Sequence, residues 1–264
     1  MAAHVEPLHL TTPLSLQQTL TSFLTVAIHT ILYTRAIYPP TTFITTRAYN
    51  FPVHQSRHPA VCDWINSSIA SIAVLLQKGS VKRIAVPIFN EDGQVMERFM
   101  FDVERFPVVG EKERWTEFEG EKGVRKQDVE EQLRGTVRRL DYACGKLKPL
   151  PEGCTFSVAV ELRDEAEVPI GNPQPWIPSE PSLQTGDKAG SETVGSDLGG
   201  VKSTPVRLVE AGEFIMEAWI EEGKAKFEHD ENQKKANVSV SGHQSMALIL
   251  MRLEPGNMGT AALG

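Results

Sequence analysis

Residues 154–162 read Cys154-Thr155-Phe156-Ser157-Val158-Ala159-Val160-Glu161-Leu162. Every second position carries a large apolar side chain: Phe156, Val158, Val160 and Leu162. This alternation is typical of a β-strand that buries one of its faces. The residues before the strand have the patterns of helices and a hairpin, and those after it are rich in proline. We therefore expect a rigid framework that ends in this strand, followed by a long C-terminal arm.

Three helices are expected ahead of the strand. Apolar residues recur at helical spacing over residues 13–38, 59–79 and 124–147. The first two helices begin with proline, which the first helical turn tolerates, and Thr12 can cap the first of them. The first apolar stripe is wide, so this helix is expected to be largely buried.

Strands and turns account for the rest of the framework. The ranges 81–89 and 95–103 are rich in β-branched and aromatic residues, and Asn90-Glu91-Asp92-Gly93 between them predicts a hairpin loop. Residues 41–53 are expected to form a short extended segment. The framework is therefore expected to combine helices with an antiparallel hairpin.

The composition changes after Leu162. Prolines surround a lone Trp176, and residues 179–204 contain almost no large apolar residue. Such a segment cannot bury enough surface to offset its ordering entropy, so we expect a disordered insertion there. The predicted organisation is a flexible N-terminus at 1–12, a domain at 13–222 and a flexible tail at 223–264. Within the domain, 13–162 form the core and 163–222 form the arm.

Composition and charge argue against several functional classes. The net charge of −7 over 264 residues disfavours a large nucleic-acid surface, which needs clustered lysine and arginine. We expect no membrane span and no signal peptide, because no apolar run has the required length or flanks. The three cysteines share no C-x-x-C spacing and fit reduced thiols in an intracellular protein.

Motifs for catalysis or metal binding are weak. His54, His58 and Cys62 recur every four residues, but Pro59 separates His58 from the helix body and no fourth ligand is evident, so we expect no metal. Residues 195–202 are glycine-rich but lack the G-K-[ST] ending of a phosphate loop. Without a recognisable catalytic motif, we expect a protein that is not an enzyme and needs no cofactor.

Five short motifs carry a family resemblance. They are Ala27-Ile28-His29-Thr30-Ile31-Leu32-Tyr33-Thr34-Arg35-Ala36-Ile37-Tyr38-Pro39, Tyr49-Asn50-Phe51-Pro52-Val53, His58-Pro59, Gly153-Cys154-Thr155-Phe156 and Pro175-Trp176-Ile177. Together they resemble the HORMA-domain accessory subunits of DNA polymerase zeta, which are relatives of the Mad-type spindle-checkpoint proteins. The resemblance covers about residues 14–222 and is clearest over 24–103.

The resemblance implies a fold and a function. The fold would be the α+β HORMA domain, with three helices packed on a small antiparallel β-sheet and a C-terminal arm called the safety belt. The arm would close over a peptide that adds a strand beside residues 154–162. The function would be that of a non-catalytic, nuclear adaptor in translesion DNA synthesis. Its partner would be the catalytic subunit of DNA polymerase zeta, which supplies a proline-bearing peptide.

The resemblance also implies roles for individual residues. Trp64 and Trp176 would line the proline pocket, although the family usually has Tyr in place of Trp64 and Leu in place of Pro178. The predicted peptide-binding set is Trp64, Trp176, Tyr49, Phe156, Val158 and Val160. Glu217 and Trp219 would contact the C-terminal domain of the deoxycytidyl transferase scaffold polymerase. Arg134 matches an arginine at the family's dimer surface. Core packing for Trp64 and simple solvation for Arg134 are the competing explanations.

Several alternatives stay open at this stage. A spindle-checkpoint or meiotic-axis HORMA protein would catch a different peptide with the same fold. A homodimer, a HORMA heterodimer and an AAA+ remodeller are further partners that the family suggests. An uncharacterised enzyme and a direct DNA binder are less well supported, because motifs are lacking and the chain is acidic.

Overall fold

A β-hairpin forms the centre of the main sheet. The structure is a computed structural model that describes residues 9–108, 115–116, 124–163 and 200–229. Strands β4 (Val81–Phe89) and β5 (Val95–Asp102) pair antiparallel. The turn is closed by Asn90, whose Oδ1 accepts a hydrogen bond of 2.8 Å from the backbone N–H of Gln94. Gly93 supplies the positive φ of 76° that this turn requires. The predicted hairpin is confirmed.

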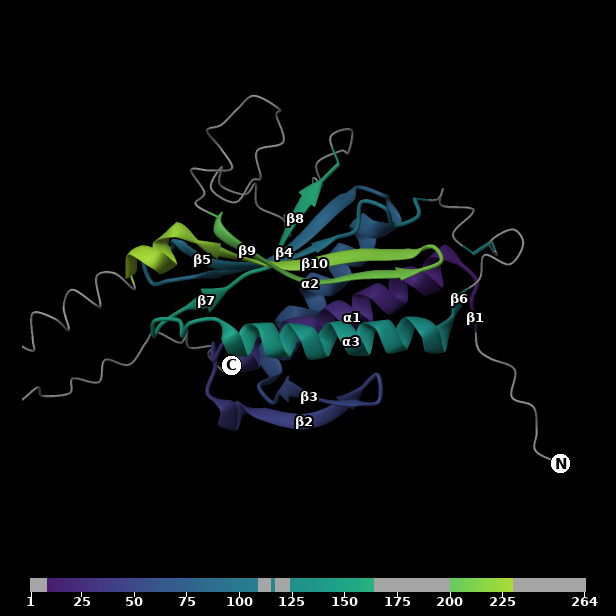
Figure 1. The fold of residues 1–264 in the computed structure, drawn as a ribbon. Helices are drawn as coiled ribbons and strands as arrows, with labels where there is room; N and C mark the ends of the chain where they lie inside the picture. Colours follow the sequence, from purple (N-terminus) through teal and green to yellow (C-terminus); the bar gives the residue numbers. More distant parts are fainter. Residues whose placement is uncertain (1–8, 109–114, 117–123, 164–199, 230–264) are drawn as a thin grey trace, which may run out of the picture. The chain divides into compact units, whose positions relative to one another are not determined.

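The sheet extends from this hairpin on both sides (Figure 1). On one side β4 pairs with β7 (Thr155–Phe156) and β8 (Ala159–Leu162). On the other side β5 pairs with β10 (Phe214–Gly223), and β10 pairs with β9 (Gly200–Ala211). All of these pairings are antiparallel. The strand predicted at 154–162 therefore lies at one edge of the sheet, and the returning arm lies at the other.

The edge strand is interrupted where it passes a proline. The backbone N–H of Ser157 donates to the carbonyl of Pro87 at 3.1 Å, but Pro87 has no N–H with which to return a second bond. The strand is consequently split into β7 and β8, with Ser157 and Val158 between them. The sequence pattern predicted one continuous strand because it contains no information about the neighbouring proline.

The three predicted helices are present. They are α1 (Pro13–Thr34), α2 (Pro59–Gln77) and α3 (Lys126–Lys146). Thr12 caps α1 through a reciprocal pair of hydrogen bonds with Ser15. Helix α1 ends four residues earlier than expected, because Ala36 adopts a left-handed conformation with φ of 53°. The three helices and the antiparallel sheet that the sequence predicted are thus observed, with a further helical segment at 224–229.

The core lies between the helices and the inner face of the sheet. Phe23 of α1 meets Phe101 of β5 edge to face, with ring centroids 5.9 Å apart. Among the described residues, α2 alone is long and apolar enough to cross a membrane by length and composition. Its apolar stripe nevertheless packs into this core, where Ile65 and Ile72 are fully buried. One side of α2 thus packs into the core, whereas Trp64 and Val74 of the same helix remain exposed.

Two small sheets complete the framework. Strands β2 (Phe43–Ala48) and β3 (Phe51–Ser56) form a hairpin where the sequence predicted only an extended segment. It follows a 3-10 turn at Pro40–Thr42. The other sheet pairs β1 (His9–Leu10) with β6 (Val124–Arg125), so part of the N-terminus expected to be flexible is in a strand.

Two stretches expected to be disordered or flexible have regular secondary structure. Strand β9 begins at Gly200, so residues 200–204 of the expected disordered insertion are hydrogen-bonded to β10. Residues 179–199 of that insertion lie outside the described residues. Residues 224–229, which were expected in a flexible tail, are helical. The chain divides into one unit at 1–227 and a second at 228–264.

Candidate functional site

The β7–β8 edge of the main sheet is the first candidate site. Within the described part of the chain, these strands have β4 as their one strand neighbour, which leaves their other side without a paired strand. Phe156 lies opposite Ile88, and Val160 lies opposite Ile84. Ile84 and Ile88 are fully buried, so this row faces the core. The edge can therefore offer its backbone to an extended segment, while Phe156 and Val160 are partly buried against the core.

An aromatic cluster flanks this edge. The ring of Trp64, from α2, packs edge to face on Phe156 of β7, with centroids 5.1 Å apart. Tyr38, from the turn after α1, meets the same Phe156 ring at 6.3 Å. Trp64 remains 42% exposed in spite of this contact. Burial raises the pKa of Tyr38 above its ordinary value.

This cluster contains one residue that sequence reasoning missed. Tyr38 lies in the Tyr38-Pro39 ending of the motif that carries the family resemblance, and the proline signalled only a helix end. Its contact with Phe156 spans two distant parts of the chain. The sequence offered one signal, an aromatic residue directly before the proline that ends a helix. This signal does not indicate which residue the aromatic ring contacts.

The other predicted peptide-binding residues occupy different places. Val158 and Val160 lie on the edge itself, and Val158 is buried. Trp176 lies outside the described residues. Tyr49 sits in the β2–β3 turn, beside a hollow that it shares with Glu130 at the start of α3. Burial, assisted by the charge of Glu130, raises the pKa of Tyr49. The structure therefore brings together Trp64 and Phe156, but not Tyr49.

The second candidate surface is the outer face of β10. Trp219 lies opposite Met100 of β5, and Glu217 lies opposite Asp102. The intervening Ala218 pairs with Phe101, which faces α1, so Glu217 and Trp219 point to the other side of the sheet. Their neighbours there include Leu208, which is 44% exposed. The indole N–H of Trp219 donates to Glu221 at 2.8 Å and fixes the ring.

Arg134 occupies a separate surface on α3. Its guanidinium donates to Glu131 at 3.0 Å, one helical turn away, and it borders a hollow beside Asn50. Among the described residues, no three His, Cys, Asp or Glu side chains gather at metal-binding distance. His54, considered as a metal ligand from its spacing, stacks on Tyr33 with ring centroids 3.5 Å apart.

The described strands of the arm dock on α3 as well as on β5. Gln132 donates to the backbone carbonyl of Glu210 at 2.7 Å, and Arg139 donates to that of Val206 at 3.2 Å. Between these two positions Gly135 makes room for Arg207, whose guanidinium would lie 2.9 Å from a Cβ at that glycine. The returning arm is therefore held along one helix and one strand of the framework.

Sequence comparison finds relatives over most of the chain. The HORMA domain family matches residues 17–197. The DNA polymerase zeta processivity subunit of Schizosaccharomyces pombe is 31% identical over 204 residues, which cover 75% of this chain and 89% of that protein. The mitotic spindle assembly checkpoint protein MAD2B of Danio rerio is 32% identical, over 60% of this chain and 73% of that protein.

Comparison with solved structures finds proteins that share the fold of this chain. A chain in the crystal structure of the mitotic checkpoint complex aligns with a TM-score of 0.58 at 18% identity, over 78% of this chain and 98% of that one. HTP-2 of C. elegans, solved bound to the HIM-3 closure motif, aligns with a TM-score of 0.55 at 14% identity, over 80% of this chain and 92% of that one. The protein therefore belongs to the HORMA-domain family, and its relatives include the DNA polymerase zeta processivity subunits.

Proposed function

We propose that this protein is a non-catalytic adaptor subunit of DNA polymerase zeta that acts in translesion DNA synthesis in the nucleus. The observation that supports this most is the β7–β8 edge, which has a strand on one side only among the described residues and is flanked by the exposed ring of Trp64. The name of the S. pombe relative, a DNA polymerase zeta processivity subunit, supports the polymerase assignment.

The proposed mechanism is strand addition. An extended peptide of the polymerase catalytic subunit pairs with the side of β7 and β8 that has no paired strand in the described part of the chain, and backbone hydrogen bonds supply affinity with little demand on sequence. A proline of the peptide then packs on Trp64 and Phe156, because its ring is apolar and its conformation is already restricted. Trp176, in the arm, is proposed as the second wall of this pocket.

The same adaptor is proposed to bind further partners elsewhere. Glu217 and Trp219 would contact the C-terminal domain of the deoxycytidyl transferase scaffold polymerase, since one is exposed and the other presents a large ring on the outer face of the sheet. Arg134 would contribute to a homodimer or HORMA heterodimer. An AAA+ remodeller would open the arm to release the peptide.

The pocket assignment is tested by truncating Trp64. With a synthetic proline-bearing peptide from the polymerase catalytic subunit, Trp64→Ala is expected to weaken binding by about 2 kcal/mol, or roughly 30-fold in Kd. Val74→Ala is the matched control, because Val74 is an exposed apolar residue of the same helix at 52% exposure. Isothermal titration provides the measurement. Unchanged affinity in a correctly folded Trp64→Ala variant would reject the pocket.

A second candidate function calls for a different experiment. Relatives named as spindle assembly checkpoint proteins, and the likeness to HTP-2 solved with a closure motif, favour a spindle-checkpoint or meiotic-axis HORMA protein. Co-purification from cells separates the two proposals. Polymerase subunits among the captured proteins support the adaptor, whereas checkpoint or axis proteins in their place support the alternative.

A further inference from the structure

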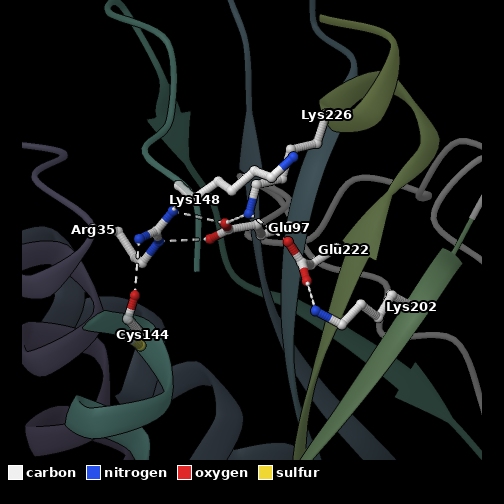
Figure 2. A network of polar contacts seen from close by, with 7 residues as sticks. All are labelled: Arg35, Glu97, Cys144, Lys148, Lys202, Glu222 and Lys226. Carbon is white, nitrogen blue, oxygen red and sulfur yellow. Dashed lines mark hydrogen bonds and ion pairs between the residues drawn. The ribbon is translucent and has the colours of Figure 1, made fainter. Parts of the chain in front are cut away.

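A buried network of charges joins the end of the arm to the framework (Figure 2). Its centre is Glu97 of β5, which is fully buried. The guanidinium of Arg35, at the end of α1, donates two hydrogen bonds of 2.8 Å to the Glu97 carboxylate. Arg35 also donates to the carbonyls of Cys144 at 2.9 Å and Lys148 at 2.6 Å. This half of the network lies entirely within the framework.

The other half comes from the arm and the helical segment after it. Lys226, which is 2% exposed, donates from Nζ to the Glu97 carboxylate and to Glu222 at 2.7 Å. Glu222, near the end of β10, also accepts a hydrogen bond of 3.1 Å from Lys202 of β9. Figure 2 shows Lys226 reaching from the helical segment toward both carboxylates. Lys226 is thus the residue that connects the two halves.

The buried charges divide evenly between the two halves, because Lys202, the remaining cation, has 60% of its side chain exposed. Arg35 and Glu97 form a neutral pair within the framework, and Glu222 and Lys226 form a neutral pair one helical turn apart. If β10 separates from β5, neither half retains a buried charge without an opposite charge beside it. An unpaired buried charge is the main penalty for breaking such networks. The network therefore stabilises the docked arm, yet β10 can separate from β5 without leaving an unpaired buried charge in either half.

A glycine places the helical segment against the framework. A Cβ atom at Gly223 would lie 2.2 Å from the backbone oxygen of Val95, far inside contact distance. The absence of a side chain lets the end of β10 approach β5 this closely. Residues 224–229 then continue as a helix, which brings Lys226 over Glu97. This close approach is an observation independent of the charges.

We propose that Glu222, Gly223 and Lys226 form a latch that fastens the arm to Glu97 and controls how often the arm opens. The latch lies at the end of β10 and just beyond it. Paired residues lead across the sheet from Glu222 to Glu97, Ile88 and Phe156, so the latch and β7 lie at the same end of these strands. The latch involves only residues of this chain, so the proposal does not depend on which peptide binds at the β7–β8 edge. It also assigns a role to residues 224–227, which the sequence pattern placed in a flexible tail.

Hydrogen exchange of the full-length chain tests the latch. In Lys226→Met, the amides of β10 that bond to β5 are expected to exchange about 10-fold faster or more, because local opening of the arm no longer has to break the contact with Glu97. The amides of α1 are expected to exchange at the unaltered rate. Lys224→Met is the matched control, because it removes an exposed lysine from the same helical segment.

A second variant leaves every charge in place. Gly223→Ala is expected to speed exchange in β10 in the same way, since its methyl group forces the strand end away from Val95. Unchanged β10 exchange in both variants would overturn the latch. Faster exchange that is equal in β10 and α1 would also overturn it, because Lys226 would then stabilise the whole fold rather than the docked arm.

Discussion

At the level of single residues, the two buried carboxylates of the latch network have different surroundings. Glu97 is shared by a guanidinium and an ammonium group, whereas Glu222 is held by two lysines, one of them largely exposed. Burial alone would raise the pKa of Glu222, but hydrogen bonds and charges from Lys226 and Lys202 outweigh it. The pKa of Glu222 therefore lies below its ordinary value of 4.5.

This shift predicts an acid-sensitive contribution to stability. Because the folded state holds the Glu222 proton less tightly than the unfolded state, the stabilisation is present above about pH 4.5 and is lost as the pH falls through the lower folded pKa. We expect Glu222→Gln to remove this part of the pH dependence. Urea unfolding at several pH values below about 5 measures it. Equal pH dependence in both proteins would contradict the assignment, provided that both unfold in one transition.

At the level of elements, α2 shows how an apolar helix can be divided between core and surface. Ile72 has no exposed surface, whereas Val74, two positions further along, is 52% exposed. Both residues are β-branched and apolar, so composition alone assigns them the same role. The difference arises because successive positions on a helix are rotated to different faces.

The two positions should therefore respond differently to truncation. Ile72→Ala is expected to lower the free energy of unfolding by about 2–4 kcal/mol, through lost burial and the cavity that it leaves. Val74→Ala is expected to change it by less than about 0.5 kcal/mol, as at most surface sites. Urea denaturation measures both values. A large loss in Val74→Ala would indicate that this face of α2 is covered.

At the level of the whole chain, the arm connects opposite edges of one sheet. It leaves after β8, beside β4, and returns as β9 and β10, beside β5. In the proposed function, a peptide bound at the β7–β8 edge is enclosed when the arm is docked on β5 and α3. Release of the peptide then requires the arm to open, which links dissociation to a local unfolding event.

This link predicts a kinetic effect of the latch on binding. We expect Lys226→Met to accelerate dissociation of a bound peptide by about the same factor as it accelerates hydrogen exchange in β10. Surface plasmon resonance with immobilised peptide measures the dissociation rate. Faster hydrogen exchange in β10 without faster peptide dissociation would still support the latch. It would show, however, that release of the peptide does not require the arm to open.

Local patterns in the sequence were sufficient for much of the framework. The three helices and the β4–β5 hairpin followed from apolar periodicity, Thr12 and the Asn90–Gly93 turn, whereas the HORMA family followed from the resemblance of a few short motifs. These signals involve residues that are close along the chain, so they can be recognised in the sequence before the fold is known. The proximity of Trp64 to Phe156 was expected only from the family resemblance.

Contacts between distant residues required the folded chain. The break between β7 and β8 depends on Pro87 of the neighbouring strand, and the pairing of Tyr38 with Phe156 depends on two separate elements. Glu97 and Lys226 are 129 positions apart, and neither has a sequence pattern that indicates a buried ion pair. The docked arm brings these two charges together, and periodicity along a chain carries no information about such an encounter.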